Sequence, residues 1–201
     1  MKKQLISAAM AAFMTMTVFA PLTVNADEWV KTDKGYTYEY DNGTTAKSGW
    51  LKVGGKTYYI KKDGTRQTGW LKTTTAKYYF DTNGVMQKSK WITMKSGAKY
   101  YLDNNGKAAV GIVKIDKVEY KFADDGKCLG VNHHFILNKE TSCLHSDSKC
   151  RAAKKIDKEN YSELDIGENE FADYSQNGYW ACGVSGCNNK DTKSALPKPK
   201  K

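Results

Sequence analysis

The chain has 201 residues, a net charge of +10 and a mean hydropathy of −0.67. That length suits one or two domains, and no stretch after the first 26 residues approaches the roughly 20 apolar residues of a membrane-spanning helix. The positive charge is spread without a block of five or six like charges, so it suits an anionic wall polymer as well as nucleic acid and does not choose between them. The 13 Tyr and 5 Trp outnumber the 6 Phe, and these amphipathic rings serve half-exposed surfaces.

The N-terminus has the three-part layout of a secretory signal peptide. Lys2 and Lys3 precede an apolar run over residues 5–20, and small residues around Ala26 suit cleavage. A buried core helix is the alternative, but acidic and aromatic sequence begins abruptly at Asp27. We therefore predict a signal peptide over residues 1–26 and a secreted mature chain without a membrane span.

A three-part pattern repeats every 20 or 21 residues from Trp29 to Gly126, which is the signature of a repeat architecture. Each unit opens on an aromatic or apolar slot, has paired aromatics eight or nine residues later, and closes on a turn dipeptide. The slots hold Trp29, Trp50, Trp70, Trp91 and Ile112. The closing dipeptides are Asn42-Gly43, Asp63-Gly64, Asn83-Gly84, Asn105-Gly106 and Asp125-Gly126.

Each unit is predicted to form a β-hairpin. In the second unit, the β-prone runs 50–53 and 57–60 flank Gly54 and Gly55, a pair that supplies the positive φ of a tight turn. One hairpin is marginal in water, but stacked hairpins bury each unit's aromatics against the next. We expect a mainly β protein, in which a solenoid of stacked β-hairpins over residues 27–127 precedes a small α+β module.

Residues 29–126 resemble the cell-wall-binding repeats of Gram-positive surface proteins, also called choline-binding or glucan-binding repeats. The resemblance is carried by Gly49-Trp50, the following tyrosine pair, Asp63-Gly64 and Gly69-Trp70, with their counterparts in register. It implies a ligand held between neighbouring hairpins by cation–π attraction or by stacking on sugars. The ligand-binding residues that it implies are Trp50, Tyr58, Tyr59, Trp70, Tyr78, Tyr79, Trp91, Tyr100 and Tyr101.

One position departs from the choline-type pattern. The slot before the tyrosine pair, where those repeats usually place a further Trp, holds Thr57, Lys77 and Lys99. A cage without that wall is a poor choline site, so the pattern favours a glucan or another wall polymer and predicts weak elution by free choline. The alternative is that Trp50, Trp70 and Trp91 serve only as core between the repeats.

After Gly126 the period stops, and all five Cys and all three His follow it. Residues 135–137 are predicted to form a buried strand, and a helix is expected to begin within residues 151–159. Residues 128–190 resemble the small metal-binding domain of Ada-type DNA-repair regulators, through the strand, Gly178-Tyr179 and the Cys and His residues in order. That resemblance implies a structural zinc ion on His145, Cys150, Cys182 and Cys187.

The cysteines leave a second chemistry open. In an oxidising exterior, Cys143 could pair with Cys150 and Cys182 with Cys187, leaving Cys128 odd, and the sequence does not decide between zinc and disulfides. His133 and His134 are expected at the surface rather than as ligands. Residues 191–201, with prolines and terminal lysines, are predicted to be a disordered basic tail.

No catalytic motif is found: there is no Gly-x-Ser-x-Gly elbow, no His-Glu-x-x-His and no phosphate-binding Gly-rich loop. We therefore expect a secreted, cell-wall-associated, non-enzymatic protein that binds teichoic acid, peptidoglycan or glucan. A protein partner is the ligand class expected for the C-terminal module. An extracellular nucleic-acid-binding protein is the second hypothesis, disfavoured because the module lacks clustered cations. A structural spore-coat or matrix protein is the third.

Overall fold

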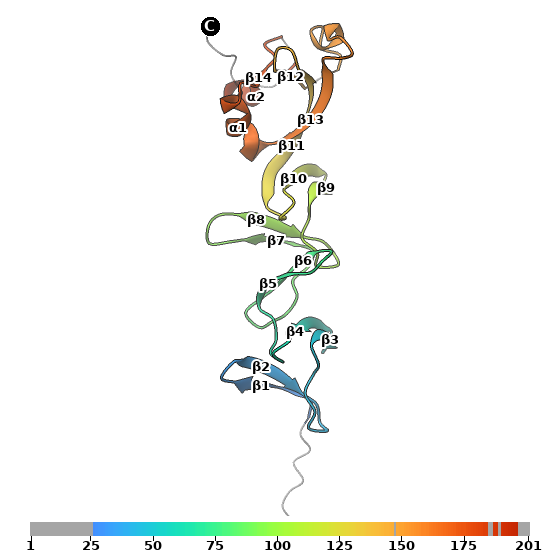
Figure 1. Cartoon of the computed structure of the whole chain (residues 1–201), viewed down its shortest axis with the longest axis vertical. Helices are drawn as coiled ribbons and strands as arrows, with labels where there is room; N and C mark the ends of the chain where they lie inside the picture. Colours follow the sequence, from blue (N-terminus) through green and yellow to red (C-terminus); the bar gives the residue numbers. More distant parts are fainter. Residues whose placement is uncertain (1–25, 147, 185–186, 189, 197–201) are drawn as a thin grey trace, which may run out of the picture.

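The structure, a computed structural model, describes residues 26–146, 148–184, 187–188 and 190–196. Five hairpins follow one another along the long axis of an elongated molecule, and a compact C-terminal module occupies its far end (Figure 1). The predicted signal peptide, residues 1–26, lies outside the described residues apart from Ala26.

The sequence repeat corresponds to five antiparallel hairpins, with strands at the tryptophan and tyrosine segments as predicted. Within residues 26–127 the structure contains no helix. The strands are β1 (Glu28–Thr32), β2 (Gly35–Glu39), β3 (Gly49–Val53), β4 (Lys56–Ile60), β5 (Gly69–Lys72), β6 (Lys77–Phe80), β7 (Lys90–Thr93), β8 (Lys99–Leu102), β9 (Gly111–Ile115) and β10 (Val118–Phe122).

The register of each of the first four hairpins places its tryptophan opposite a tyrosine, as in the pair Trp50↔Tyr59 of β3 and β4. The turn after β4 shows how the closing dipeptide works. Asp63 Oδ1 accepts hydrogen bonds from the backbone N–H (3.0 Å) and the hydroxyl (2.7 Å) of Thr65. Gly64 takes a φ of 81°, a left-handed conformation that suits glycine. The turn chemistry read from the sequence therefore sets the repeat boundaries.

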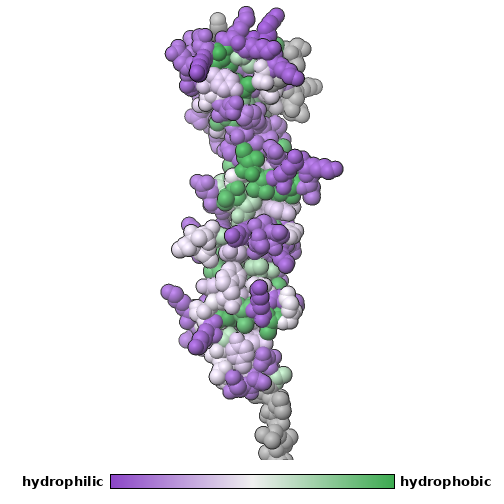
Figure 2. Space-filling model, turned by 90° about the vertical axis from the view of Figure 1, so that its right-hand side faces the viewer, coloured by the Kyte–Doolittle hydropathy of each residue, from purple (hydrophilic) through white to green (hydrophobic). Residues whose placement is uncertain are grey.

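Backbone hydrogen bonds tie each unit to one further along the chain. The N–H of Arg66 donates to the carbonyl of Tyr36 at 2.8 Å. In the next two units, the N–H groups of Met86 and Ala108 donate at the same distance to the carbonyls of Thr57 and Lys77, respectively. The side chains enclosed between units are fully buried: Ile60, Phe80 and Leu102 are each 0% exposed. Stacking thus supplies the continuous core that a single hairpin lacks. On the face that Figure 2 shows, hydrophobic residues collect in separate patches along the repeats.

The fifth hairpin does not end the sheet. Strand β10 pairs with β11 (Cys128–Asn138), so β9 and β10 join the C-terminal module in one six-stranded sheet, ordered β14-β12-β11-β10-β9 with β13 also paired to β11. The sequence pattern changes between residues 127 and 128, where the domain boundary was expected, but the sheet continues across this point. Ile112, in the last tryptophan slot, is 46% exposed because no sixth hairpin covers it.

The C-terminal module packs two small cores around β11. Phe135 and Leu144 are fully buried in one core with Ile166 and Phe171, and Phe135 lies within the predicted buried strand. The second core contains four of the cysteines. The elements after β11 are β12 (Cys143–His145), η1 (Ala153–Lys155), β13 (Tyr161–Gly167), η2 (Glu168–Glu170), α1 (Phe171–Gln176), β14 (Trp180–Ala181) and α2 (Lys190–Ala195).

Two local predictions need correction. Residues 151–159 contain only the single turn of η1, because Ile156 has an extended backbone (φ −75°, ψ 124°) that ends the turn. The tail predicted to be disordered from residue 191 begins as helix α2, and Leu196 after it is 0% exposed in the first core. Residues 197–201 lie outside the described part. None of the described helices is long and apolar enough to cross a membrane.

Candidate aromatic binding sites and candidate metal centre

Each tryptophan of the repeats lies between two tyrosines, one from its own hairpin and one from the next. The Trp50 ring lies 5.3 Å from Tyr59 across the hairpin and 4.9 Å from Tyr78 of the following unit. We name the four clusters by their tryptophans. The other three are the Trp29 site with Tyr38 and Tyr58, the Trp70 site with Tyr79 and Tyr100, and the Trp91 site with Tyr101 and Tyr120.

The nine residues that the repeat resemblance implied all fall in these clusters, but they are not equivalent. Tyr58 is 6% exposed and belongs to the core, whereas Trp50 is 48% exposed. Trp50 also lies 6.0 Å from the buried ring of Phe80. The tryptophans are therefore partly core between repeats, and the exposed face of Trp50 remains available to a ligand.

Two of the four clusters hold a cation of the chain itself. The Lys77 ammonium lies 4.3 Å from the Trp70 ring centroid and 4.8 Å from that of Tyr100. The Arg66 guanidinium lies 4.1 Å from the Tyr36 ring and 5.4 Å from the Trp29 ring. The sequence identified Lys77 as a slot residue, but nothing in the pattern indicated Arg66.

The Trp91 site opens into a cavity of about 900 Å³ between the β7–β8 hairpin and the C-terminal module. Trp91 and Tyr120 line its aromatic side, while Lys99, Lys127 and Glu168 line its polar side. This combination of ring faces and charges can accept an amphipathic ligand that carries both apolar and ionic groups. The repeat pattern does not predict this cavity, because part of its wall, including Glu168, lies outside the repeats.

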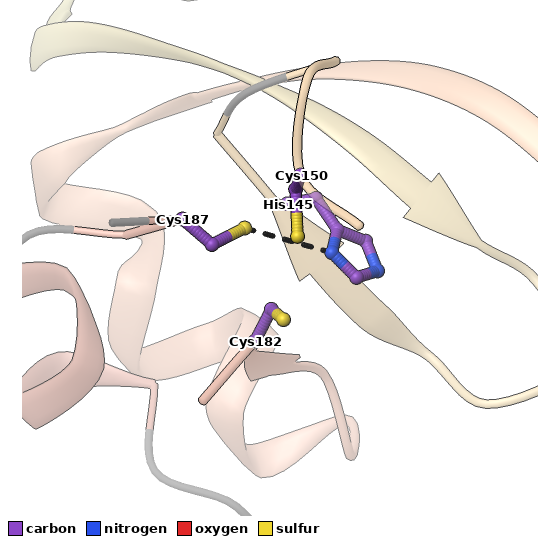
Figure 3. A group of neighbouring side chains, drawn as sticks. All are labelled: His145, Cys150, Cys182 and Cys187. Atoms are coloured by element: carbon purple, nitrogen blue, oxygen red, sulfur yellow. Dashed lines mark hydrogen bonds between the residues drawn. The ribbon is translucent and has the colours of Figure 1, made fainter. Parts of the chain in front are cut away.

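The four residues expected to bind metal converge from two segments. His145 ends β12, Cys150 follows it, and Cys182 and Cys187 come after β14. Their ligand atoms lie within 4.8 Å of one another, all four residues are buried, and they point toward a common centre (Figure 3). Cys187 Sγ and His145 Nδ1 are 3.6 Å apart. A tetrahedral Zn²⁺ with Zn–S bonds of about 2.3 Å separates its ligand atoms by about 3.8 Å, so the Cys187–His145 pair has this spacing and no pair exceeds it by more than about 1 Å.

Backbone N–H groups lie next to sulfur atoms of this group, and burial shifts the pKa values of several members. The N–H of Val184 donates to Cys182 Sγ at 3.4 Å. Burial tends to raise the pKa of Cys150, but hydrogen bonds from the Ala153 backbone, the Cys187 thiol, the Ala152 backbone and the Cys182 thiol together lower this pKa. Burial lowers the pKa of His145, which keeps its imidazole neutral and able to bind metal. Burial and contact with Cys150 raise the pKa of Cys187 to about 12, so a metal would have to displace its proton.

Asn188 holds the two metal-site segments together, and sequence reasoning missed it. Its buried amide Nδ2 donates to the carbonyls of Leu144 (3.0 Å) and Cys182 (3.2 Å), one from each segment, which the Cys182 N–H also joins by donating to the Leu144 carbonyl at 2.8 Å. No signal in the sequence marks it beyond its place after Cys187. The chemistry of one imidazole and three thiols in this fixed frame fits Zn²⁺.

The remaining Cys and His residues lie apart from the four-ligand group. All five cysteines are free in the structure, and Cys143 is buried beside the group, where burial raises its pKa. As expected, His133 and His134 are not members: they lie on β11 within 3.3 Å of Glu168 and 3.1 Å of Asp165. Cys128 is buried at the wall of the Trp91 cavity.

The comparisons with known families bear on the hairpins. A family model described as a choline-binding repeat matches residues 47–91, and one described as a putative cell wall binding repeat matches residues 89–108. Residues 47–108 are cell-wall-binding repeats of the choline-binding type. These residues include the Trp50, Trp70 and Trp91 slots. No curated protein sequence matches the chain.

Among solved structures, CbpJ from Streptococcus pneumoniae TIGR4 is 28% identical over 51% of this chain and 35% of its own, with a TM-score of 0.47. The choline binding domain of Spr1274 from Streptococcus pneumoniae is 32% identical over 40% of this chain and 93% of its own, with a TM-score of 0.36. A pneumococcal cell wall endolysin from phage Cp-1, complexed with choline, is 31% identical over 51% and 30%, with a TM-score of 0.44. The chain spans about a third of the length of the first structures that it matches.

Proposed function

We propose that this protein is a secreted, non-catalytic binder of choline-bearing cell-wall polymer. The observation that carries the proposal is the exposed face of Trp50, held between Tyr59 and Tyr78 within the residues that match choline-binding repeats. The ring faces of Trp and Tyr attract a quaternary ammonium through their negative quadrupole, and no counter-charge is needed.

The Trp91 site extends this chemistry to the polymer chain. Trp91 and Tyr120 offer ring faces for an ammonium group or a sugar, and Lys99 and Lys127 in the same cavity offer positive charges for phosphate. A wall polymer that carries both choline and phosphate matches the two halves of this cavity. Glucan, which lacks both groups, would use only the ring faces.

Binding through several weak sites explains how a wall-associated protein could be retained. A half-exposed cation–π contact is worth about 0.5–1 kcal/mol, so one site alone binds weakly. Sites on a rigid column that engage one polymer raise the overall affinity through effective concentration. We therefore expect free choline to elute the protein poorly, because it must compete at all occupied sites together.

For the C-terminal module we propose a structural zinc ion on His145, Cys150, Cys182 and Cys187. When bound, zinc would supply a cross-link between the β12 and β14 segments. The chain's own contribution is the buried frame, in which Asn188 and the Val184 N–H fix the ligand positions. We propose that this module binds a protein partner.

The test is retention of the full mature chain on purified walls that carry choline, compared with the same walls after the choline-bearing polymer has been stripped and with insoluble glucan. We expect retention on the first and loss on the second. Equal retention on stripped walls would refute the choline proposal, and retention on glucan alone would assign the repeats to glucan.

A further inference from the structure

We propose that Lys77 and Arg66 are built-in ligands that close two of the four aromatic sites, so that an external quaternary ammonium group can enter only the Trp50 and Trp91 sites. The exclusion of an external ammonium group rests on the proposed function. The placement of Lys77 and Arg66 over the rings depends only on contacts within the chain.

The Lys77 ammonium occupies the position that a ligand would take in the Trp70 site. Its nitrogen lies 4.3 Å from the Trp70 centroid and 4.8 Å from the Tyr100 centroid, and the two centroids are 4.6 Å apart. The three points form a nearly equilateral triangle, so the cation contacts both ring faces at once. Both distances are within the range of about 6 Å for cation–π attraction.

A distant carbonyl anchors the ammonium in this position. Lys77 Nζ donates to the carbonyl of Asp125 at 3.1 Å, in the turn that closes the fifth hairpin. Lys77 is half-buried. The lysine is therefore fixed at its tip by a turn two units further along the array, as well as by the two rings.

Lys99 provides an internal comparison, because it fills the same slot one repeat later. Its side chain is exposed, it lines the open Trp91 cavity, and within residues 26–146 the structure shows it over no ring. The difference follows from the array: the turn that would anchor Lys99 is two units ahead, where the repeats have ended. The Trp50 site has Thr57 in this slot, and no Lys or Arg in the described part of the chain lies over the Trp50, Tyr59 or Tyr78 ring.

Arg66 closes the Trp29 site from a different position in the repeat. Its guanidinium lies 4.1 Å from the Tyr36 ring and 5.4 Å from the Trp29 ring, and Nη2 donates to the carbonyl of Thr82 at 3.3 Å. The side chain runs so close over Gly84 that a Cβ there would lie 2.8 Å from Arg66 Cδ. Arg66 thus combines ring stacking with a carbonyl anchor, as Lys77 does.

A built-in cation lowers the affinity of the site for an external ligand, because the ligand can bind only while the cation is away from the rings. An occupied site must first release its own cation, so the apparent Kd rises in inverse proportion to the open fraction. A cation–π contact with two rings and one hydrogen bond predicts roughly a tenfold loss of affinity at the Trp70 site relative to the Trp50 site.

The occupancy is tested on the full mature chain without any ligand. The variants are Lys77→Gln and the matched control Lys72→Gln, which changes the exposed register partner of Lys77 in the same hairpin. We expect the Lys77 methylene protons to show upfield ring-current shifts in the NMR spectrum, and its amine to be acylated several-fold more slowly than that of Lys72. Unshifted methylene protons and acylation at the Lys72 rate would overturn the proposal.

The consequence is tested by titration with choline, followed through the indole N–H signals. In the wild-type chain and in Lys72→Gln, we expect the Trp50 and Trp91 signals to move at roughly tenfold lower choline than the Trp70 signal, and in Lys77→Gln all three to move together. A Trp70 signal that moves with the others in the wild type would refute the closed site. A protected Lys77 with no indole shift in any variant would leave the occupancy standing and refute choline binding instead.

Discussion

Removal of zinc from the C-terminal module should release two segments of chain and leave the rest folded. The apolar cluster around the site contains six buried residues, four of which are cysteines. Ala152, Ile156, Trp180 and Val184 pack against it only partly buried, so Ile136 and Ala153 are its buried aliphatic side chains. Burial of those two side chains contributes about 3 kcal/mol. Ordering the roughly 15 residues that carry Cys150, Cys182 and Cys187 costs about 1–2 kcal/mol for each residue. The ordering cost that this burial leaves uncompensated is about 12–27 kcal/mol. At its lower end it is matched by the roughly 10–16 kcal/mol that structural zinc supplies.

Hydrogen exchange with mass spectrometry can measure this release. We expect residues 148–156 and 182–188 to lose protection after chelation, while the repeats and the core around Phe135 keep theirs, because that core is separate. Metal analysis should find about one zinc per chain, which Cys187→Ser abolishes. The control Cys143→Ser alters a buried thiol outside the four-ligand group and should retain zinc. A metal-free protein that lacks four hydrogens by mass would establish the two disulfides and refute the zinc site.

Three further changes test the packing on which the sites depend. Phe80→Ala should lower the free energy of unfolding of the repeats by about 3–5 kcal/mol in urea titrations, since Phe80 is 0% exposed between units, and a loss below 1 kcal/mol would contradict a continuous core. Asn188→Ala should destabilise the module by about 1–3 kcal/mol by removing its bonds to Leu144 and Cys182, and an unchanged melting temperature would argue against that clamp. Gly84→Ala should displace Arg66 and expose the Trp29 indole, whereas Gly43→Ala, with a similar φ and open space around its Cβ, should add backbone strain alone.

The hairpins could be predicted from the sequence because their determinants are local and repeated. The tryptophan, the tyrosine pair and the turn glycine each recur in register, and every unit gives the same signal. The four candidate metal ligands were also predicted, through a family resemblance rather than through spacing. Their convergence depends on the parallel pairing of β12 with β14, which the sequence does not show.

The closed sites could not be predicted, because they depend on contacts across the array. Lys77 and Lys99 fill the same slot, yet only Lys77 finds a carbonyl, 48 residues away, that directs its ammonium over the rings. The tail was mispredicted for a related reason. Its composition is polar and lysine-rich, but Thr192 and Leu196 are buried and Ala195 packs against the first core of the module, which holds helix α2 in place.

The central claim, that wall polymer binds at the open aromatic sites, is tested most directly by a pair of double variants of the full chain on choline-bearing walls. The Trp50→Ala/Trp91→Ala protein lacks both open sites, and the Trp29→Ala/Trp70→Ala protein lacks both sites that the chain fills itself. The first pair removes the exposed Trp50 and the half-buried Trp91, and the second removes two half-buried tryptophans, so thermal melts followed by circular dichroism should first show that both variants are folded. The account predicts that the first variant is released from the walls while the second is retained like the wild type. Equal retention of the two folded variants, or release of the second alone, would contradict it.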